Sequence, residues 1–268
     1  MADKRHTVPV AYLVIIILFL SSCALVKENR DPCPCLLEIH LTGTQGSTAT
    51  IQVDTGEDTW NLYAAGDTVL HVYVPRTSVT VTAWSGAPEP FCGVFCISPG
   101  TAAPPLYLCQ CTVNALGDET IVRAQLRKQF CTLQLFVEGP PGWGTPFSTR
   151  IRGTVAGIGS DGIPVEGNFD YSPDNLSGTD SSNNGSSSPW TWSARIPRQF
   201  ANNQLLLDIV MEDSTVRTFS LDSYLLDAGF DWSAPDLEDL DLCLHLSVTA
   251  ITLRSPTWRP EETLSINI

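Results

Sequence analysis

Short runs of alternating apolar and polar residues, separated by Gly, Pro, Asp, Asn and Ser, fill most of this chain. Alternation with a period of two residues is typical of half-buried β-strands. The clearest runs, DTVLHVYV and SVTVTAW, are also rich in the β-branched and aromatic residues that strands favour. The pattern predicts strands over residues 35–41, 49–53, 67–74, 78–84, 106–113, 131–137, 147–158, 190–196, 204–211, 215–221, 241–254 and 264–268. The chain is therefore predicted to be an all-β protein.

Three segments depart from this pattern. Residues 118–129 hold the only sustained run of helix-tolerant residues in the first half, and we expect either a linker helix or the segment that crosses between two domains. Residues 221–228, followed by Gly229, predict a short helix with a glycine stop. Residues 159–189 are polar and turn-rich, and they predict a long solvated loop. The glycines within residues 147–158 predict a bend or bulge in that strand.

The first residues predict export. Two basic residues precede an unbroken apolar run over residues 10–20, and small residues follow it, which together describe a secretory signal over residues 1–22. The run is too short to span a bilayer, which needs about 20 apolar residues. The quartet Leu20-Ser21-Ser22-Cys23 resembles a bacterial lipobox, in which the cysteine is acylated; an ordinary signal peptide with a chance cysteine is the alternative. Acyl chains on Cys23 would anchor the protein in a membrane, with residues 23–34 as a polar tether.

The charge of the chain limits its partners. The formal net charge is −14, and the predicted signal carries +1 through Asp3, Lys4 and Arg5, so the mature chain carries −15. Such an acidic balance argues against nucleic acid and against an anionic lipid surface as partners. The mature length suits two domains of ordinary size, which we predict to occupy residues 35–124 and 125–268.

Nine cysteines are many for a cytosolic chain, and eight remain when Cys23 is set aside. They are Cys33, Cys35, Cys92, Cys96, Cys109, Cys111, Cys131 and Cys243. In an exported protein an even number predicts up to four disulfides, whose pairing the sequence leaves open. Because residues i and i+2 of a strand share a face, Cys109 and Cys111 would face two partners on a neighbouring strand, and Cys33 with Cys35 is one candidate pair. The alternative is a zinc site built from Cys92, Cys96, Cys109 and Cys111, over which an oxidising compartment favours disulfides.

No catalytic motif is found: the sequence lacks a nucleophile elbow, a zinc-protease helix motif, a phosphate loop and a dinucleotide fingerprint. Three histidines alternate with apolar neighbours inside predicted strands, as solvent-facing residues do: His40, His71 and His245. The acidic stretch 227–241 lacks the spacing of a calcium loop, and we interpret it as a solvated turn. Trp190 and Trp192 share one strand face and form either a sugar-stacking platform or part of a sandwich core. We expect no enzymatic activity, no cofactor and no metal.

Several segments together resemble a known family. They are the quartet ending at Cys23, the charged spacer 27–31, Cys33-Pro34 leading into the strand at 36–41, the strand at 79–84, and in the second half residues 133–138, 152–158 and 248–258. This arrangement resembles the fimbrillin-A-associated anchor proteins of Bacteroides-type bacteria, which are lipoproteins that fix pili to the outer membrane. The extra cysteines depart from the family pattern: Cys35, Cys92, Cys96, Cys109 and Cys111.

The resemblance implies two tandem transthyretin-like β-sandwich domains without catalysis or cofactor. It also implies that the chain, held in the outer membrane by a lipid on Cys23, anchors or terminates a donor-strand-assembled pilus at the cell surface, with pilus subunits as its partners. The alternative function is a surface glycan-binding lipoprotein of a carbohydrate-uptake system, for which Trp190 and Trp192 would supply the platform.

Overall fold

The computed structural model describes residues 33–138, 147–173, 190–201, 204–211, 213–227, 229–246, 250–255 and 259–267, with the backbone alone for residues 138, 190, 245–246, 250–255 and 259–267. The predicted signal, Cys23 and most of the predicted tether lie outside these residues. Within the described ranges, no helix has the length and apolar character needed to cross a membrane.

The first part of the chain forms two sheets that face each other, which we call the N-terminal body. Its strands are β1 (Cys35–Thr42), β2 (Thr48–Asp54), β3 (Thr59–Ala65), β4 (Thr68–Val74), β5 (Ser78–Ser85), β7 (Tyr107–Asn114), β8 (Glu119–Gln125) and β9 (Arg127–Lys128). One sheet has the order β4-β1-β8 and the other β3-β2-β5-β7-β9. Burial alternates along β1, where Leu37 and Ile39 point into the core and meet Ile51 and Val81 from the second sheet.

The rest of the chain forms a second pair of sheets, the C-terminal body. Its elements are β10 (Phe130–Glu138), β11 (Phe147–Gly159), β12 (Pro164–Tyr171), β13 (Trp190–Pro197), β14 (Leu205–Met211), β15 (Val216–Ser220), α2 (Leu221–Asp227), β16 (Leu240–Leu246), β17 (Ala250–Ser255) and β18 (Arg259–Asn267). The sheet orders are β13-β10-β16-β17-β18 and β12-β11-β14-β15. Leu135, Ile151, Leu207 and Phe219 lie in the core between the sheets, and α2 buries Tyr224 against it.

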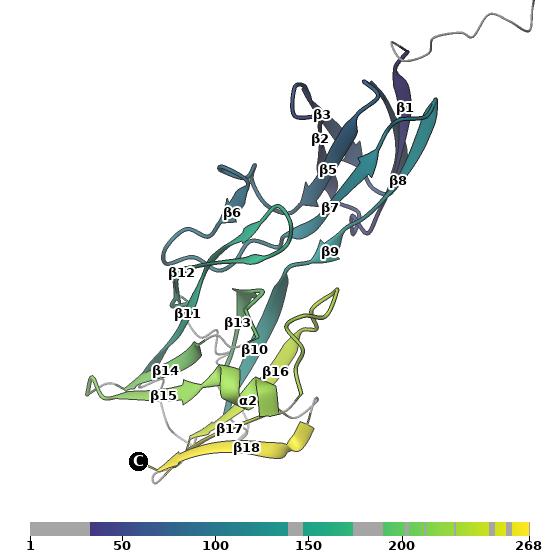
Figure 1. Cartoon of the computed structure of the whole chain (residues 1–268). Helices are drawn as coiled ribbons and strands as arrows, with labels where there is room; N and C mark the ends of the chain where they lie inside the picture. The colour runs from purple at the N-terminus through teal and green to yellow at the C-terminus, as the bar shows by residue number, and fades with distance from the viewer. Residues whose placement is uncertain are drawn as a thin grey trace, which may run out of the picture.

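The two bodies follow one another along an elongated molecule (Figure 1) and are joined by more than the connecting strand. The short strand β6 (Val94–Cys96) leaves the N-terminal body and pairs with β11 of the C-terminal body. A separate cluster of buried apolar side chains lies at this contact: Trp84, Phe95, Leu106, Leu108, Val155 and Ile158. The rings of Trp84 and Phe95 meet edge to face, with centroids 5.7 Å apart.

The all-β prediction is confirmed, and most predicted strands exist with nearly the predicted bounds. The bend predicted within residues 147–158 is also confirmed, because the pairing of β11 with β12 shifts register at Gly153 and at Gly157. The short helix and its stop are confirmed: α2 is followed by Gly229 at φ +81°, and the amide of Phe230 bonds the carbonyl of Leu225.

Four details of the sequence prediction were wrong. Of the two alternatives for residues 118–129, the linker helix is wrong: they form β8 and β9, because β8 pairs with β1 and buries Val122 and Ala124, which outweighs helix propensity. The predicted loop 159–189 contains β12, which pairs with β11. The predicted strand 241–254 is two antiparallel strands, β16 and β17. The strands β3 and β6 were not predicted.

The predicted boundary between residues 124 and 125 remains a prediction. In the structure Gln125 ends β8, β9 still pairs with β7, and β10 begins at Phe130.

Candidate functional site

The N-terminal body leaves two neighbouring strand edges unpaired at one margin. β3 and β4 are joined only by Gly66 and Asp67, and each is the terminal strand of its sheet. Neither outer edge has a strand partner within the residues that the structure describes. Free edges expose N–H and C=O groups that another chain can pair with.

Apolar side chains lie only half-covered beneath these edges. They are Trp60 and Leu62 of β3 and Leu70 and Val72 of β4, all packed against the N-terminal core. We call these four residues, with the two free edges, the open margin. A strand laid along it would gain main-chain hydrogen bonds and would cover apolar surface at the same time.

The turn that closes one end of the open margin is fixed by Asp67. Its Oδ1 accepts hydrogen bonds from the amide of Thr44 (3.0 Å) and from the Thr44 hydroxyl (2.8 Å), which lowers the pKa of Asp67. Gly66 has φ +80°, a conformation that residues with a Cβ rarely adopt. The connection between β3 and β4 is therefore a defined turn.

The opposite margin of the N-terminal body, between β7 and β8, is more closed. β9 pairs with Tyr107 and Leu108 of β7, and part of β7 lies close to β8. Beside it, at the junction of the two bodies, lies a pocket of about 380 Å³ that is lined by Cys109, Gln110, Arg127 and Arg198, among others.

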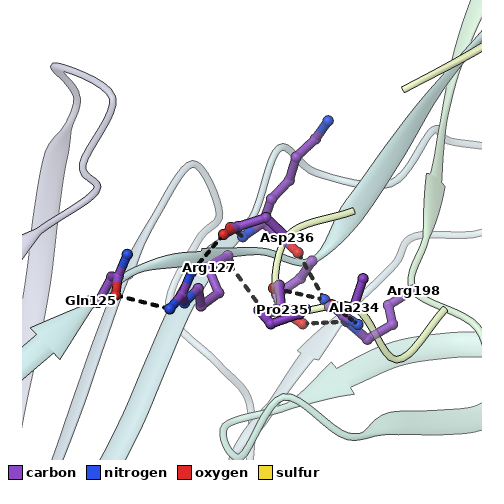
Figure 2. Close-up of polar contacts among 8 residues, drawn as sticks. Gln125, Arg127, Arg198, Ala234, Pro235 and Asp236 are labelled. Carbon is purple, nitrogen blue, oxygen red and sulfur yellow. Dashed lines mark hydrogen bonds and ion pairs between the residues drawn. The ribbon is translucent and has the colours of Figure 1, made fainter. Parts of the chain in front are cut away.

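Arg198 holds the wall of this junction together. It is 8% exposed, and its guanidinium donates to the side-chain oxygen of Gln129 (2.8 Å) and to the carbonyls of Trp232 (2.5 Å) and Ala234 (2.8 Å). It also donates to the carbonyl of Lys128 (3.1 Å), so one side chain ties the connecting strand to the loop before β16 (Figure 2). Burial lowers the pKa of Arg198, which nevertheless keeps its charge at neutral pH.

Two aspartates of the acidic stretch complete this contact. Asp236 accepts from the guanidinium of Arg127 (2.8 Å) and from the amide of Lys128 (2.9 Å). Asp239 accepts from the ammonium of Lys128 (2.6 Å) and from the amide of Thr132 (2.6 Å). We call Arg127, Lys128, Arg198, Asp236 and Asp239 the junction clamp. The sequence interpretation of residues 227–241 as a merely solvated turn missed this role.

No disulfide joins any of the eight cysteines that the structure describes, so the predicted disulfides are absent from it. Cys35 does not face Cys109 and Cys111; it is buried on β1, where its Sγ lies 3.5 Å from the hydroxyl of Thr120. Cys109 and Cys111 share a face of β7, as predicted, and both pack against the core of the N-terminal body. In the described residues, no group of three or more His, Cys, Asp or Glu side chains could hold a metal ion.

The tryptophan pair is only partly described. Trp192 is 6% exposed and belongs to the core of the C-terminal body, where its indole nitrogen has no hydrogen-bond partner. Its ring is therefore not at the surface. The side chain of Trp190 and the lipid-attachment candidate Cys23 lie outside the described residues.

A second pocket, of about 290 Å³, lies on the outer face of β11 and β12 and is polar. Arg150 donates from Nε to Asp170 (2.7 Å), and Arg152 donates to Asp208 (2.6 and 3.0 Å). Burial acts to raise the pKa of Asp208, but the bonds from Arg152 and from the hydroxyl of Thr218 (2.7 Å) outweigh it and leave that pKa below its ordinary value.

No protein-family model and no curated protein matches this chain. Solved structures with the same fold do match. A candidate polysaccharide-binding protein of Bacteroides thetaiotaomicron is 12% identical, with a TM-score of 0.63 over 87% of this chain and 98% of that one. A candidate adhesin of Bacteroides ovatus is 14% identical (TM-score 0.62, 84% and 94% covered), and the fimbrial anchor protein Mfa2 of Porphyromonas gingivalis is 10% identical (TM-score 0.58, 88% and 96%). The resemblance predicted from the sequence is confirmed at the level of the fold.

Proposed function

We propose that this protein is a non-catalytic adhesion protein of the cell envelope, and that it anchors or terminates a donor-strand-assembled pilus. In this proposal a lipid on Cys23 holds it at the outer membrane, and a pilus subunit is its partner. The likeness of fold to an adhesin candidate and to a fimbrial anchor supports the proposal. The observation that carries it is the open margin, where two free strand edges border half-covered apolar side chains.

The open margin meets the physical needs of strand donation. A donated strand gains affinity from main-chain hydrogen bonds to a free edge, and it gains specificity from alternate side chains that enter pockets. In the open margin, Trp60, Leu62, Leu70 and Val72 would be the side chains that contact those of a donated strand. Because the strand would seal the margin of the core, binding would also stabilise the N-terminal body.

Deleting the gene and measuring pilus protein in cells and in medium tests the anchoring role. We expect pili to be longer and to be shed into the medium. Unchanged partition of pilus protein would contradict an anchoring function.

A matched pair of variants tests the site itself. Trp60→Ala with Leu62→Ala should release pili in the same way, because it removes apolar surface from the open margin. Tyr63→Ala, whose side chain on the same strand is 71% exposed, should retain them. Both proteins must keep the melting behaviour of a folded chain. Equal retention by the two would show that pili bind elsewhere.

Glycan binding is the second candidate function, and the polar pocket on β11 and β12 is the observation that favours it. Its lining includes Arg150, Asn168, Asp170 and Gln204, whose planar polar groups can form paired hydrogen bonds with sugar hydroxyls. Calorimetry with surface polysaccharides should then show binding that Asn168→Ala and Gln204→Ala together abolish. Absence of heat with the unmodified protein would remove this candidate.

A further inference from the structure

We propose that the C-terminal body has a strand-accepting margin of its own, and that this chain fills it with one of its own segments, residues 97–103. We call this segment the strap, and the strands β12 and β13 beneath it the strapped margin. The ligand of such a site is an extended stretch of polypeptide. The inference rests on contacts of the C-terminal body and does not depend on the proposed pilus function.

Hydrogen bonds tie the strap to both sheets of the C-terminal body. The amide of Gly100 donates to the carbonyl of Asp170 in β12 (3.1 Å), and the amide of Ala103 donates to the carbonyl of Arg195 in β13 (3.0 Å). The side chain of Arg195 donates in return from Nε to the carbonyl of Ala103 (2.8 Å). Because β12 and β13 are the terminal strands of the two sheets, the strap lies across the margin where both sheets end.

Two side chains of the strap enter the core of the C-terminal body. Ile97 is 9% exposed and Ala103 is 1% exposed, and both belong to the buried cluster of that body. Among the described residues, every other buried member of this cluster lies at or after Cys131. The amide of Ile97 also donates to the carbonyl of Ala156 in β11 (2.9 Å). Main-chain hydrogen bonds and inserted side chains are the two features by which an added strand is recognised at a sheet edge, and the strap has both.

The strap is nevertheless held by few contacts. Residues 98–101 are exposed, and the carbonyl of Ser98 accepts from the amide (3.1 Å) and the hydroxyl (2.7 Å) of Thr101, so the middle of the strap is a turn. Pro99 has no N–H to donate. The strap thus gives one amide to β12 and one to β13, whereas a regular antiparallel partner bonds an edge at every second residue. A continuous strand would gain more hydrogen bonds at this margin than the strap does.

The covalent connection of the strap lets it exclude other strands all the same. β6 directly precedes the strap and pairs with β11, with Cys96 opposite Gly157, so the strap stays beside its margin even when it opens. A tethered segment acts at an effective concentration of about a millimolar, which a free peptide at micromolar concentration does not match. The strapped margin should therefore be closed to other strands in the unaltered protein, and it should accept one when the strap is weakened.

The test weakens the strap in the full-length protein and offers the same segment as a separate peptide. Ala103→Glu places a charged side chain where a methyl group is 1% exposed, so it should expel the strap. Thr101→Glu adds the same charge at an exposed position and is the control. The probe is a fluorescent peptide of residues 94–105 that carries Cys96→Ser. Fluorescence polarisation should show that the Ala103→Glu protein binds this peptide at least about tenfold more tightly than the Thr101→Glu protein or the unaltered protein does.

Hydrogen exchange and a second peptide locate the binding. Amides of β12 and β13 should exchange faster in the Ala103→Glu protein than in the control and should slow again when the peptide binds. A peptide that itself carries Ala103→Glu should not bind.

A second variant guards against a protein that does not fold. Ile97→Ala with Arg195→Met removes a buried side chain and a hydrogen-bond donor without burying a charge, and we expect the same gain of peptide binding from it. A folded, strap-weakened variant that does not bind the peptide overturns the proposal, because the margin then accepts no strand. Equal binding by the Thr101→Glu protein also overturns it, because the peptide would then lie elsewhere.

Discussion

The N-terminal body and the C-terminal body each consist of two facing sheets, but they cover their cores differently. Among the side chains that the structure describes, the N-terminal core has eight half-buried members at its margins: Trp60, Leu62, Leu70, Val72, Tyr107, Cys109, Cys111 and Val113. The C-terminal core has two, Tyr171 and Met211. Both bodies have terminal strands, so free edges alone do not distinguish them. Among the described side chains, which do not include those of β17 and β18, the difference lies in the apolar surface beneath the edges.

Under the proposed function, this comparison would give the two bodies different tasks. The N-terminal body presents half-covered apolar side chains that a partner strand can cover, whereas in the C-terminal body α2 packs Tyr224 and Leu225 against the core. The junction clamp links the two, because Arg198 donates hydrogen bonds both to Lys128 of β9 and to Trp232 of the C-terminal body. The predictions below test this division, starting with the largest expected effect.

Truncation of a side chain in the core of the C-terminal body should cause the largest loss of stability. Phe219 is 1% exposed in the core of the C-terminal body, and Phe219→Ala should lower the free energy of unfolding by about 3–5 kcal/mol, because a cavity of aromatic size cannot collapse in a well-covered core. Chemical denaturation measures the change. A loss below about 1 kcal/mol would mean that this core is as loosely covered as the open margin.

Removal of Arg198, the central side chain of the junction clamp, should cause the next largest loss of stability. Arg198→Met keeps much of the volume but leaves the carbonyls of Trp232 and Ala234 without their donor, so we expect a loss of about 2–3 kcal/mol. We expect calorimetry to show one unfolding transition for the unaltered protein and two for Arg198→Met, because the bodies lose their coupling. Arg123→Met, at an exposed position of β8, is the control and should change neither quantity. One unaltered transition in Arg198→Met would show that β6 and β11 couple the bodies without the clamp.

The buried carboxylate of the C-terminal body should make stability depend on pH. Asp208 is 3% exposed, and its pKa in the folded state lies below the unfolded value of about 4. Its contribution is therefore fully present above pH 4 and is lost as the pH falls through the folded pKa. Asp208→Asn should cost about 1–2 kcal/mol at pH 7, a figure reduced because Arg152 is well exposed, and the cost should shrink below pH 4. The exposed Asp170→Asn should change little at either pH; a cost for Asp208→Asn that does not vary with pH would contradict the assignment.

The sequence predicted the core residues of both bodies well, but it did not predict the open margin of the N-terminal body. Alternation such as that around Leu37 and Ile39 identifies inward residues, because the period of a strand is local. Which strands are terminal in a sheet depends on pairing between distant segments, so no local signal marked β3 or β4 as an edge. For the same reason the role of Arg198 was not predicted. It is a single arginine after a strand, and the carbonyl of Trp232 that it donates to lies more than thirty residues away along the chain. Cys109 and Cys111 were placed on one face, but their partners were mistaken, since the neighbours of β7 are set by topology.

The smallest effect should come from the open margin itself. Val72 of β4 lies opposite Leu37 of β1, so the two positions share one register of one sheet but differ in cover. Leu37 is fully buried, and Leu37→Ala should cost about 2–5 kcal/mol. Val72 is half-buried, and Val72→Ala should cost about 1 kcal/mol or less, because water already reaches part of the methyl groups that are removed. Denaturation with and without a bound pilus subunit measures both. Binding should raise the cost of Val72→Ala towards that of a core position, because the donated strand would exclude water from it, while the cost of Leu37→Ala should stay the same. If the subunit binds and the cost of Val72→Ala does not change, the partner strand does not lie along β4.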